Sequence, residues 1–233
     1  SRDFINLVNN YKKSKYIKLK CLSVHIGSQI LDHKPYEKML KSIIKILRKV
    51  GYRFEFIDLG GGMGISYSNR EKKLNYKKYH SAIKNFLSKY NSKIIFEPGR
   101  SIIGNTGILI SKIIYIKKSE RKKFIILDTA MNDLMRPALY GAKHKIMPAL
   151  KKTKILKENH EFVGPICEST DSFLNLKNFQ EIKENEIIAI CDVGAYGMSL
   201  GSNYNLRPKP IELMIRGTKI KVIKRRQKYI DFI

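Results

Sequence analysis

Three short stretches of this 233-residue sequence combine reactive side chains with glycines or sharp turns. They are His25-Ile26-Gly27-Ser28, Gly60-Gly61-Gly62 and Glu97-Pro98-Gly99-Arg100. Consecutive glycines let backbone N–H groups approach an anion closely, as a phosphate-binding turn requires. The other two stretches supply an aromatic base, a carboxylate and a guanidinium. Taken singly, each stretch also has an ordinary structural explanation: a structural histidine, a tight turn or a local ion pair.

Each stretch ends a segment whose composition is typical of a buried β-strand. These strand segments cover residues 17–26, 54–62 and 93–100, and apolar residues at helical spacing separate them at 35–50 and 76–90. The alternation of strand and helix predicts parallel strands joined by helices. In a β/α barrel, the loops after the strands form the face on which sites are built. We therefore expect the three stretches to converge.

The pattern changes after Arg100, where strand-like segments follow one another with short turns and little helix. These segments are residues 107–117, 123–129, 154–164, 187–193 and 211–224. They predict a second, mostly antiparallel β domain, with the boundary near 101–106. The expected domains are therefore residues 1–103 and 104–233.

Composition narrows the class of protein. Hydrophobic residues make up 43% of the chain, enough for a buried core, and no window of roughly 18 apolar residues predicts a membrane span. The three cysteines include no CxxC pair, which argues against a disulfide framework or a zinc site and favours the reducing cytoplasm. We expect no metal and no signal peptide.

The formal net charge is +26, which raises the possibility of a nucleic-acid-binding surface. The excess is mostly lysine and accompanies abundant isoleucine, asparagine and tyrosine, as compositional drift would produce. The lysines occur in scattered pairs such as 72–73 and 151–152, and they form no stripe interleaved with aromatic residues. We therefore interpret the charge as a solvated surface and expect neither a nucleic-acid nor a membrane partner.

Together, the three stretches supply the groups that pyridoxal 5'-phosphate needs. Its phosphate requires backbone donors and an arginine, and its ring requires a flat partner. A carboxylate beside the pyridine nitrogen raises the pKa of that nitrogen and keeps it protonated, so that the ring can accept electrons.

The full series of motifs resembles the diaminopimelate decarboxylase family, in the family's order. The motifs, which run from His25 to Asn205, are HIGSQ, DLGGGMGISY, EPGRSI, DTAMNDLMRPALYGAKH, VGPICEST and DVGAYGMSLGSNYN. The resemblance implies the C-terminal part of a (β/α)8 barrel followed by an antiparallel β-barrel or sandwich domain. It also implies decarboxylation of meso-2,6-diaminopimelate to L-lysine and CO2, by a homodimer with sites at the subunit interface.

The resemblance assigns cofactor roles to the strand ends. His25 would stack on the ring and take part in catalysis, and Glu97 would pair with the pyridine nitrogen. Tyr196 would contact both cofactor and substrate. The residues expected to hold the phosphate are Ser28, Gly61, Gly62, Gly99 and Arg100, the last of which also faces the substrate.

Further roles fall in the second half of the chain. Arg136 and Tyr140 resemble residues that bind the substrate's distal carboxylate, which an arginine can do with two parallel hydrogen bonds. Cys167 and Glu168 resemble residues donated across the dimer interface, as the general acid and as the ligand of the distal amino group. The structural alternatives are a surface charge for Arg136, a small buried residue for Cys167 and a core aromatic for Tyr196.

One expected feature of the family is missing from these 233 residues. The cofactor-binding lysine of the family lies in a motif resembling Tyr-Ala-x-Lys-Ala-Asn, and the contexts of Lys18 and Lys20 differ from it. The chain also begins at Ser1 within a predicted helix. We interpret the sequence as part of a longer protein and expect it alone neither to decarboxylate nor to fold well, because a slice of a barrel exposes sheet edges.

Other functions stay open at this point. Decarboxylases of the same fold act on ornithine, arginine or carboxynorspermidine, but the ornithine enzymes carry Asp after the cysteine, whereas this chain has Glu168 within CES. The RPALY motif also favours diaminopimelate. A non-catalytic homologue without the lysine and a nucleic-acid-binding module are the remaining alternatives.

Overall fold

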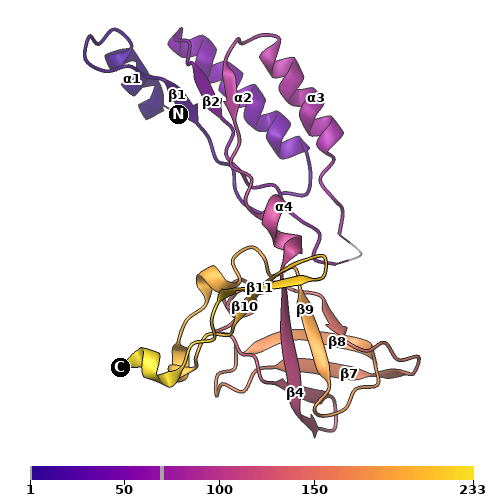
Figure 1. Ribbon diagram of the computed structural model, residues 1–233. Helices are drawn as coiled ribbons and strands as arrows, with labels where there is room; N and C mark the ends of the chain where they lie inside the picture. Colours follow the sequence, from indigo (N-terminus) through magenta and orange to yellow (C-terminus); the bar gives the residue numbers. More distant parts are fainter. Residues whose placement is uncertain (1, 69–70) are drawn as a thin grey trace. The chain divides into compact units, whose positions relative to one another are not determined.

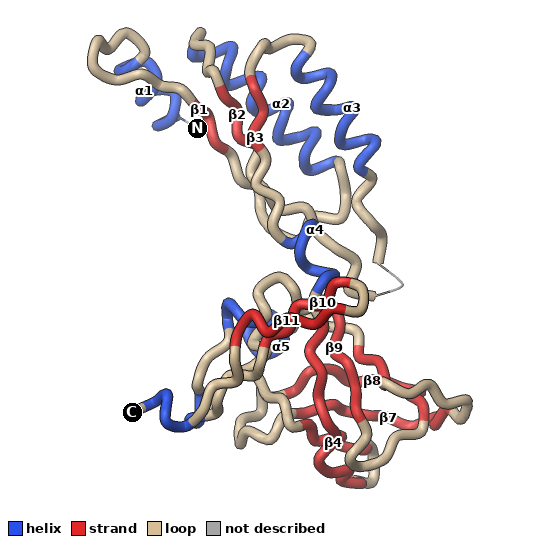
Figure 2. The backbone as a smooth tube through the Cα atoms, in the orientation of Figure 1, coloured by secondary structure: helices blue, strands red, loops and turns tan. Residues whose placement is uncertain are grey.

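The computed structural model describes residues 2–68 and 71–233. The chain forms two compact units, Ser1–Ile103 and Gly104–Ile233 (Figure 1). The long helices belong to the first unit and most of the strands to the second (Figure 2).

The first unit is built on three parallel strands in the order β1-β2-β3. They are β1 (Cys21–Ser23), β2 (Phe56–Asp58) and β3 (Lys93–Ile95), paired in register from Cys21 through Phe56 to Lys93. Between them run the helices α2 (Lys34–Val50) and α3 (Tyr76–Leu87). The predicted parallel strands joined by helices are thus confirmed, although the regular strands are shorter than the predicted segments.

Helix α2 begins and ends where its sequence indicates. Pro35 lies in the first turn, where a missing N–H costs nothing. Gly51 adopts the left-handed conformation at φ 57° and donates its N–H to the carbonyl of Leu47. A further helix, α1 (Arg2–Tyr11), buries Val8, and α4 (Arg100–Ile103) ends the unit.

Two tyrosines connect the helices to the strand ends. Tyr36 of α2 and Tyr79 of α3 are buried, with ring centroids 4.3 Å apart. The Tyr36 hydroxyl donates to the carbonyl oxygen of Gly61 at 3.4 Å. Burial raises the pKa of Tyr79 to about 12 and raises that of Tyr36 as well, so both hydroxyls remain protonated near neutral pH. The Tyr79 hydroxyl has no hydrogen-bond partner among the described residues.

The second unit contains a six-stranded sheet in the order β6-β9-β4-β5-β7-β8. Its strands are β4 (Ile108–Lys118), β5 (Lys123–Leu127), β6 (Ile146–Pro148), β7 (Ile155–Val163), β8 (Ser172–Gln180) and β9 (Ile187–Cys191). Strand β4 pairs with β9 along its first half and with β5 along its second half. A register shift between Ile113 and Tyr115 lies at the change of partner, as expected for a bulge that bends a sheet.

The structure corrects several expectations for this unit. The sheet is mostly antiparallel as predicted, but β5 and β7 are parallel. The segment 211–224 is a hairpin of β10 (Glu212–Arg216) and β11 (Lys219–Lys224) that turns at Gly217 with φ 60°.

Strands β6 and β8 and the short helix α5 (Arg136–Tyr140) were not predicted. Single helical turns occupy Gly104–Thr106, Met198–Leu200, Tyr204–Leu206 and Tyr229–Phe232.

The core of the second unit forms where β4, β5, β7 and β9 bury aliphatic and aromatic side chains. Ile113, Ile125, Phe162, Ile188 and Ile190 are all fully buried. Burying one such side chain stabilises a fold by roughly 1.5–3 kcal/mol. This cluster therefore fixes the strands whose ends carry the loops described below.

A histidine lies within this apolar sheet. His160 of β7 is fully buried, its ring lies 6.0 Å from that of Phe179, and neither ring nitrogen has a hydrogen-bond partner among the described residues. Burial lowers the pKa of His160, opposed by Glu158 at 3.9 Å and assisted by Lys123. The unfolded chain therefore binds a proton that the folded chain rejects as the pH falls through the ordinary histidine range.

We predict that the unfolding free energy falls between pH 7.5 and pH 5.5 and that His160→Leu makes this fall smaller. Urea unfolding of the purified wild-type and variant proteins at the two pH values measures this change in unfolding free energy. His80→Leu, at an exposed position of α3, is the matched control and should keep the wild-type pH dependence. An unchanged pH dependence in His160→Leu would contradict the prediction.

Candidate active site

The loops that follow β1, β2 and β3 lie against one another through direct backbone hydrogen bonds. The amide of Glu97 donates to the carbonyl of Gly60 at 3.0 Å, and the amide of Ile30 donates to that of Gly62 at 2.9 Å. An isolated bridge pairs Ile30 with Met63. The convergence expected from the three motifs is therefore present in this unit.

Glycine is required at the centre of this arrangement because neighbouring backbone occupies the space of a side chain. A Cβ atom at Gly62 would lie 2.2 Å from the carbonyl oxygen of Gly27, and one at Gly61 would lie 2.3 Å from that of Glu97. Gly62 also has φ 82°, a conformation that L residues rarely adopt. The glycine turn thus fills the gap between the first and third loops.

Asp58 holds the start of the glycine turn. Its carboxylate accepts from the amide of Gly60 and from the hydroxyl of Ser23, both at 2.8 Å. The side chain is 6% exposed. Asp58 was not among the predicted site residues, although a carboxylate two residues before a glycine is a known signal for a side-chain-stabilised turn.

The arginine of the third loop reaches the first loop. One Nη of Arg100 donates to the Ser28 hydroxyl at 3.3 Å, and the other donates to the Tyr67 hydroxyl at 2.5 Å. Tyr67 is buried and lies within the DLGGGMGISY motif, but it was not predicted as a site residue. Arg100, Ser28 and the glycine turn therefore offer one positive charge with backbone and hydroxyl groups, a set suited to a phosphate.

His25, Glu97 and Gly99 lie on the same loops and are exposed. The position of a Cβ at Gly60 would be 2.9 Å from Nδ1 of His25, which places the imidazole directly beside the glycine turn. Seven of the residues predicted for the cofactor therefore lie in three adjoining loops and at Arg100, the first residue of α4.

We predict that Gly62→Ala destabilises the protein by more than about 3 kcal/mol, since the new methyl group collides with backbone. Gly51→Ala is a matched control: it also has positive φ, but nothing lies within 4 Å of its Cβ position. Gly51→Ala should lower the free energy of unfolding by about 1 kcal/mol. Thermal or urea unfolding measures the stability that each variant loses. Equal losses in the two variants would show that the close approach of the Gly27 carbonyl to Gly62 does not limit stability.

In the second unit, Arg136 is the first residue of α5 and is only 5% exposed. Its Nη1 donates to Nε2 of His144 at 2.8 Å, and Nδ1 of His144 donates to the carbonyl of Cys191 at 2.9 Å. The alternative that Arg136 is a surface charge is wrong. Tyr140 ends the helix and is 67% exposed, so its side chain is available to a ligand.

Cys167 and Glu168 are exposed at the tip of a closed loop. The amide of Gly164 donates to the carbonyl of Asp171 at 2.9 Å, which closes the loop at its base. The buried carboxylate of Asp171 accepts from the amide of Ile166 at 2.9 Å and from that of Met131 at 2.7 Å. The alternative that Cys167 is a small buried residue is therefore wrong.

Asp171 thus ties the loop of Cys167 to the segment that leads to Arg136. A second, partly buried carboxylate, Asp133, accepts from the amide of Ala130 at 2.9 Å and from the hydroxyl of Thr129 at 3.1 Å. Burial raises the pKa of both carboxyl groups, so each ionised form depends on these hydrogen bonds. Asp171 was not among the predicted site residues, although it directly follows the VGPICEST motif.

Tyr196 has φ 59° and is 47% exposed, so it is not the core aromatic of the structural alternative. It follows β9 on a segment that returns to Asn132, whose carbonyl accepts from the amide of Ser202 at 2.9 Å. Arg207 donates to the Asn132 side chain at 3.0 Å and to the carbonyl of Asp128 at 2.6 Å. These bonds fix the Tyr196 segment to the one that precedes Arg136.

We predict strong coupling between Gly164 and Asp171. A Cβ at Gly164 would lie 2.2 Å from a carboxylate oxygen of Asp171. Gly164→Ala and Asp171→Ala should each destabilise the protein by about 2 kcal/mol, the second because two backbone N–H groups lose their acceptor. The double variant should be no less stable than Asp171→Ala, because without the Asp171 carboxylate the new methyl group at position 164 no longer collides. Urea unfolding of the wild type, the two single variants and the double variant measures the coupling. Losses of unfolding free energy that simply add in the double variant would contradict the prediction.

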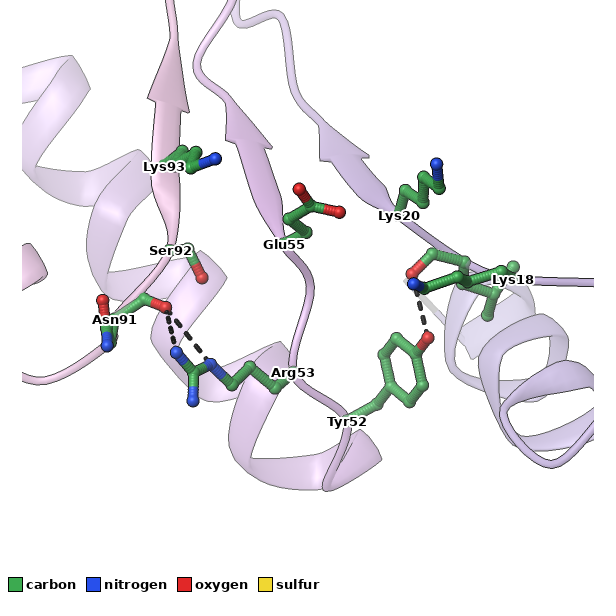
Figure 3. A pocket seen from close by; sticks show the side chains of 9 residues that line it. Lys18, Lys20, Tyr52, Arg53, Glu55, Asn91, Ser92 and Lys93 are labelled. Atoms are coloured by element: carbon green, nitrogen blue, oxygen red, sulfur yellow. Dashed lines mark hydrogen bonds between the residues drawn. The ribbon is translucent and has the colours of Figure 1, made fainter.

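A cavity of about 480 Å³ in the first unit lies away from these loops (Figure 3). It is at the opposite ends of the strands, beside the residues that precede β1, β2 and β3. Arg53 donates to the Asn91 carbonyl at 3.2 and 2.7 Å, and the Tyr52 hydroxyl donates to Leu19 at 2.9 Å. These bonds stabilise the turns there, and none of the predicted site residues lines this cavity.

Within the described part of the chain, no group of three or more His, Cys, Asp or Glu side chains is placed to hold a metal ion. None of its helices combines the length and apolar character needed to cross a membrane.

Comparison with known proteins places the chain in a family. Residues 11–194 match the model of the pyridoxal-dependent decarboxylase C-terminal sheet domain, and the chain belongs to this family. It is 37% identical over 224 residues to diaminopimelate decarboxylase of Aquifex aeolicus (strain VF5), covering 95% of this chain and 53% of the relative. It is 41% identical over 223 residues to that of Helicobacter pylori, covering 94% and 55%.

A solved structure is also similar. The crystal structure of diaminopimelate decarboxylase from Helicobacter pylori complexed with L-lysine superposes with a TM-score of 0.89 at 39% identity, covering 99% of this chain and 57% of that one. The chain therefore spans about half the length of the curated relatives it matches.

Proposed function

We propose that this chain is part of a pyridoxal-phosphate-dependent decarboxylase that converts meso-2,6-diaminopimelate to L-lysine and CO2. The observation that carries the proposal is the convergence of the loops after β1, β2 and β3. The relatives at 37 and 41% identity, both diaminopimelate decarboxylases, support the choice of substrate. On this proposal, β1–β3 belong to a (β/α)8 barrel and residues 104–233 form the β domain.

The residues of the first unit fit pyridoxal 5'-phosphate. Ser28, Gly99 and Arg100 bind the phosphate together with Gly61 and Gly62, whose lack of side chains lets other groups approach closely. This assignment follows from the donor set, since a guanidinium and backbone N–H groups are the ordinary ligands of phosphate.

Two further residues orient the ring of the cofactor. His25 would be its stacking partner, and Glu97 would hold a proton at its ring nitrogen. When bound, the cofactor draws electrons away from the carbon that loses CO2. A carboxylate is suited to the role of Glu97 because a nearby negative charge raises the pKa of a protonated nitrogen.

The residues of the second unit recognise the substrate. Arg136 and Tyr140 bind the distal carboxylate, and Glu168 binds the distal ammonium group. Cys167 delivers a proton to the carbon from which CO2 has left. Tyr196 contacts the cofactor and the substrate. The exposure of Tyr140, Cys167, Glu168 and Tyr196 is consistent with these roles.

The proposal includes a cytoplasmic homodimer in which Cys167 and Glu168 act in the site of the partner subunit. Apolar side chains exposed on the hairpin β10–β11 support an interface: Ile215 and Ile220 pair across the strands, and each is 67% exposed. Exposed apolar patches of this kind are typical of protein contact surfaces.

The test is CO2 release by the protein that contains this sequence, purified with pyridoxal phosphate. The proposal predicts activity on meso-2,6-diaminopimelate and much less on ornithine, arginine or carboxynorspermidine. Activity mainly on one of the latter would assign the chain to another decarboxylase of the same fold. Binding of the cofactor without turnover of any of these amino acids would indicate a non-catalytic homologue.

We predict that Arg136→Met and Cys167→Ala affect different kinetic constants. Arg136→Met should raise KM for diaminopimelate by about 100-fold, since a charge-assisted carboxylate contact is lost. Cys167→Ala should mainly lower kcat. Arg121→Met, in the exposed turn before β5, is the matched control and should leave both constants unchanged. A loss confined to kcat in Arg136→Met would contradict the assigned role.

A further inference from the structure

Two hydrogen bonds of the buried His144 side chain assign its tautomer. A guanidinium can only donate hydrogen bonds, so Nε2 of His144, 2.8 Å from Nη1 of Arg136, must be a bare acceptor. A carbonyl oxygen can only accept, so Nδ1, 2.9 Å from the Cys191 carbonyl, must carry the proton. The imidazole in this arrangement is therefore the neutral Nδ1–H tautomer.

His144 is itself attached to the sheet. The amide of Cys191, the last residue of β9, donates to the carbonyl of Lys145 at 2.8 Å, and Ile146 pairs with Ile190. Gly141, which follows helix α5, has φ 62°, and its N–H donates back to the carbonyls of Arg136 and Pro137. The imidazole consequently connects the first residue of α5 to the end of β9.

We propose that His144 is a positioning residue that orients the Arg136 guanidinium for a ligand's carboxylate without itself neutralising that guanidinium. A carboxylate in its place would form a charge-assisted, bidentate pair with Arg136 and compete with the ligand. The neutral Nε2 of His144 instead accepts one N–H group of Arg136 and adds no negative charge. The inference rests on the proposed function, in which Arg136 binds the distal carboxylate of the substrate.

The chemistry of the reaction provides a probe for this role. Loss of one carboxylate from diaminopimelate gives lysine, which keeps the carboxylate that Arg136 binds. Cadaverine has the same carbon chain and both amino groups but no carboxylate. Damage to the position of Arg136 should therefore weaken the binding of L-lysine and leave that of cadaverine unchanged.

The experiment is calorimetric titration of the cofactor-loaded protein with L-lysine and with cadaverine. His144→Leu and His144→Glu should each weaken lysine binding by about tenfold or more, the first by releasing the guanidinium and the second by pairing with it. Cadaverine binding should change by less than about twofold, since it lacks the ionic contact. His144→Gln should restore much of the affinity for lysine, because its side chain can both accept and donate.

His80→Leu is the control for removing a histidine from an exposed position, and it should bind both ligands normally. Equal weakening of lysine and cadaverine in His144→Leu, or no weakening of lysine, would overturn the proposal. A wild-type protein that binds lysine more tightly than cadaverine but does not decarboxylate diaminopimelate would contradict the proposed function instead. The two failures are therefore distinguishable.

Discussion

The close backbone approach at the glycine turn is the constraint on which the first unit depends. Gly60 and Gly62 use their carbonyl groups to bind the amides of Glu97 and Ile30, and no side chain could fit between the loops. The strand ends are therefore held together by main-chain contacts, and Asp58 fixes the entry to the turn. This backbone arrangement places His25 beside the glycine turn and lets Arg100 reach Ser28 of the first loop.

The second unit achieves comparable order in its loops by a different means. Buried carboxylates replace regular secondary structure as the acceptors of main-chain N–H groups, with Asp171 joining the Cys167 loop to Met131. An ionised group in such a setting is tolerated only because its oxygens are hydrogen-bonded. The side chains at the loop tips can then be exposed while the backbone beneath them is fixed.

Local patterns in the sequence were sufficient to predict helices α2 and α3 and the meeting of the three motifs, because apolar spacing, Pro35 and Gly51 all act within one element. Strand β8 was missed because polar residues interrupt its apolar positions, of which Phe173 and Phe179 are buried. The contact between Arg136 and His144 could not be predicted, since it depends on a turn and on burial of a charge that sequences normally place at the surface.

Strand β4 has a further consequence for how the second unit unfolds. Its first half is bonded to β9 and its second half to β5, so one continuous stretch of backbone belongs to both parts of the sheet. Neither part can separate without breaking hydrogen bonds made by the same strand. Residues 104–233 should therefore lose their structure in a single cooperative transition. A destabilising substitution near Ile113 should weaken both the pairing of β4 with β9 and its pairing with β5.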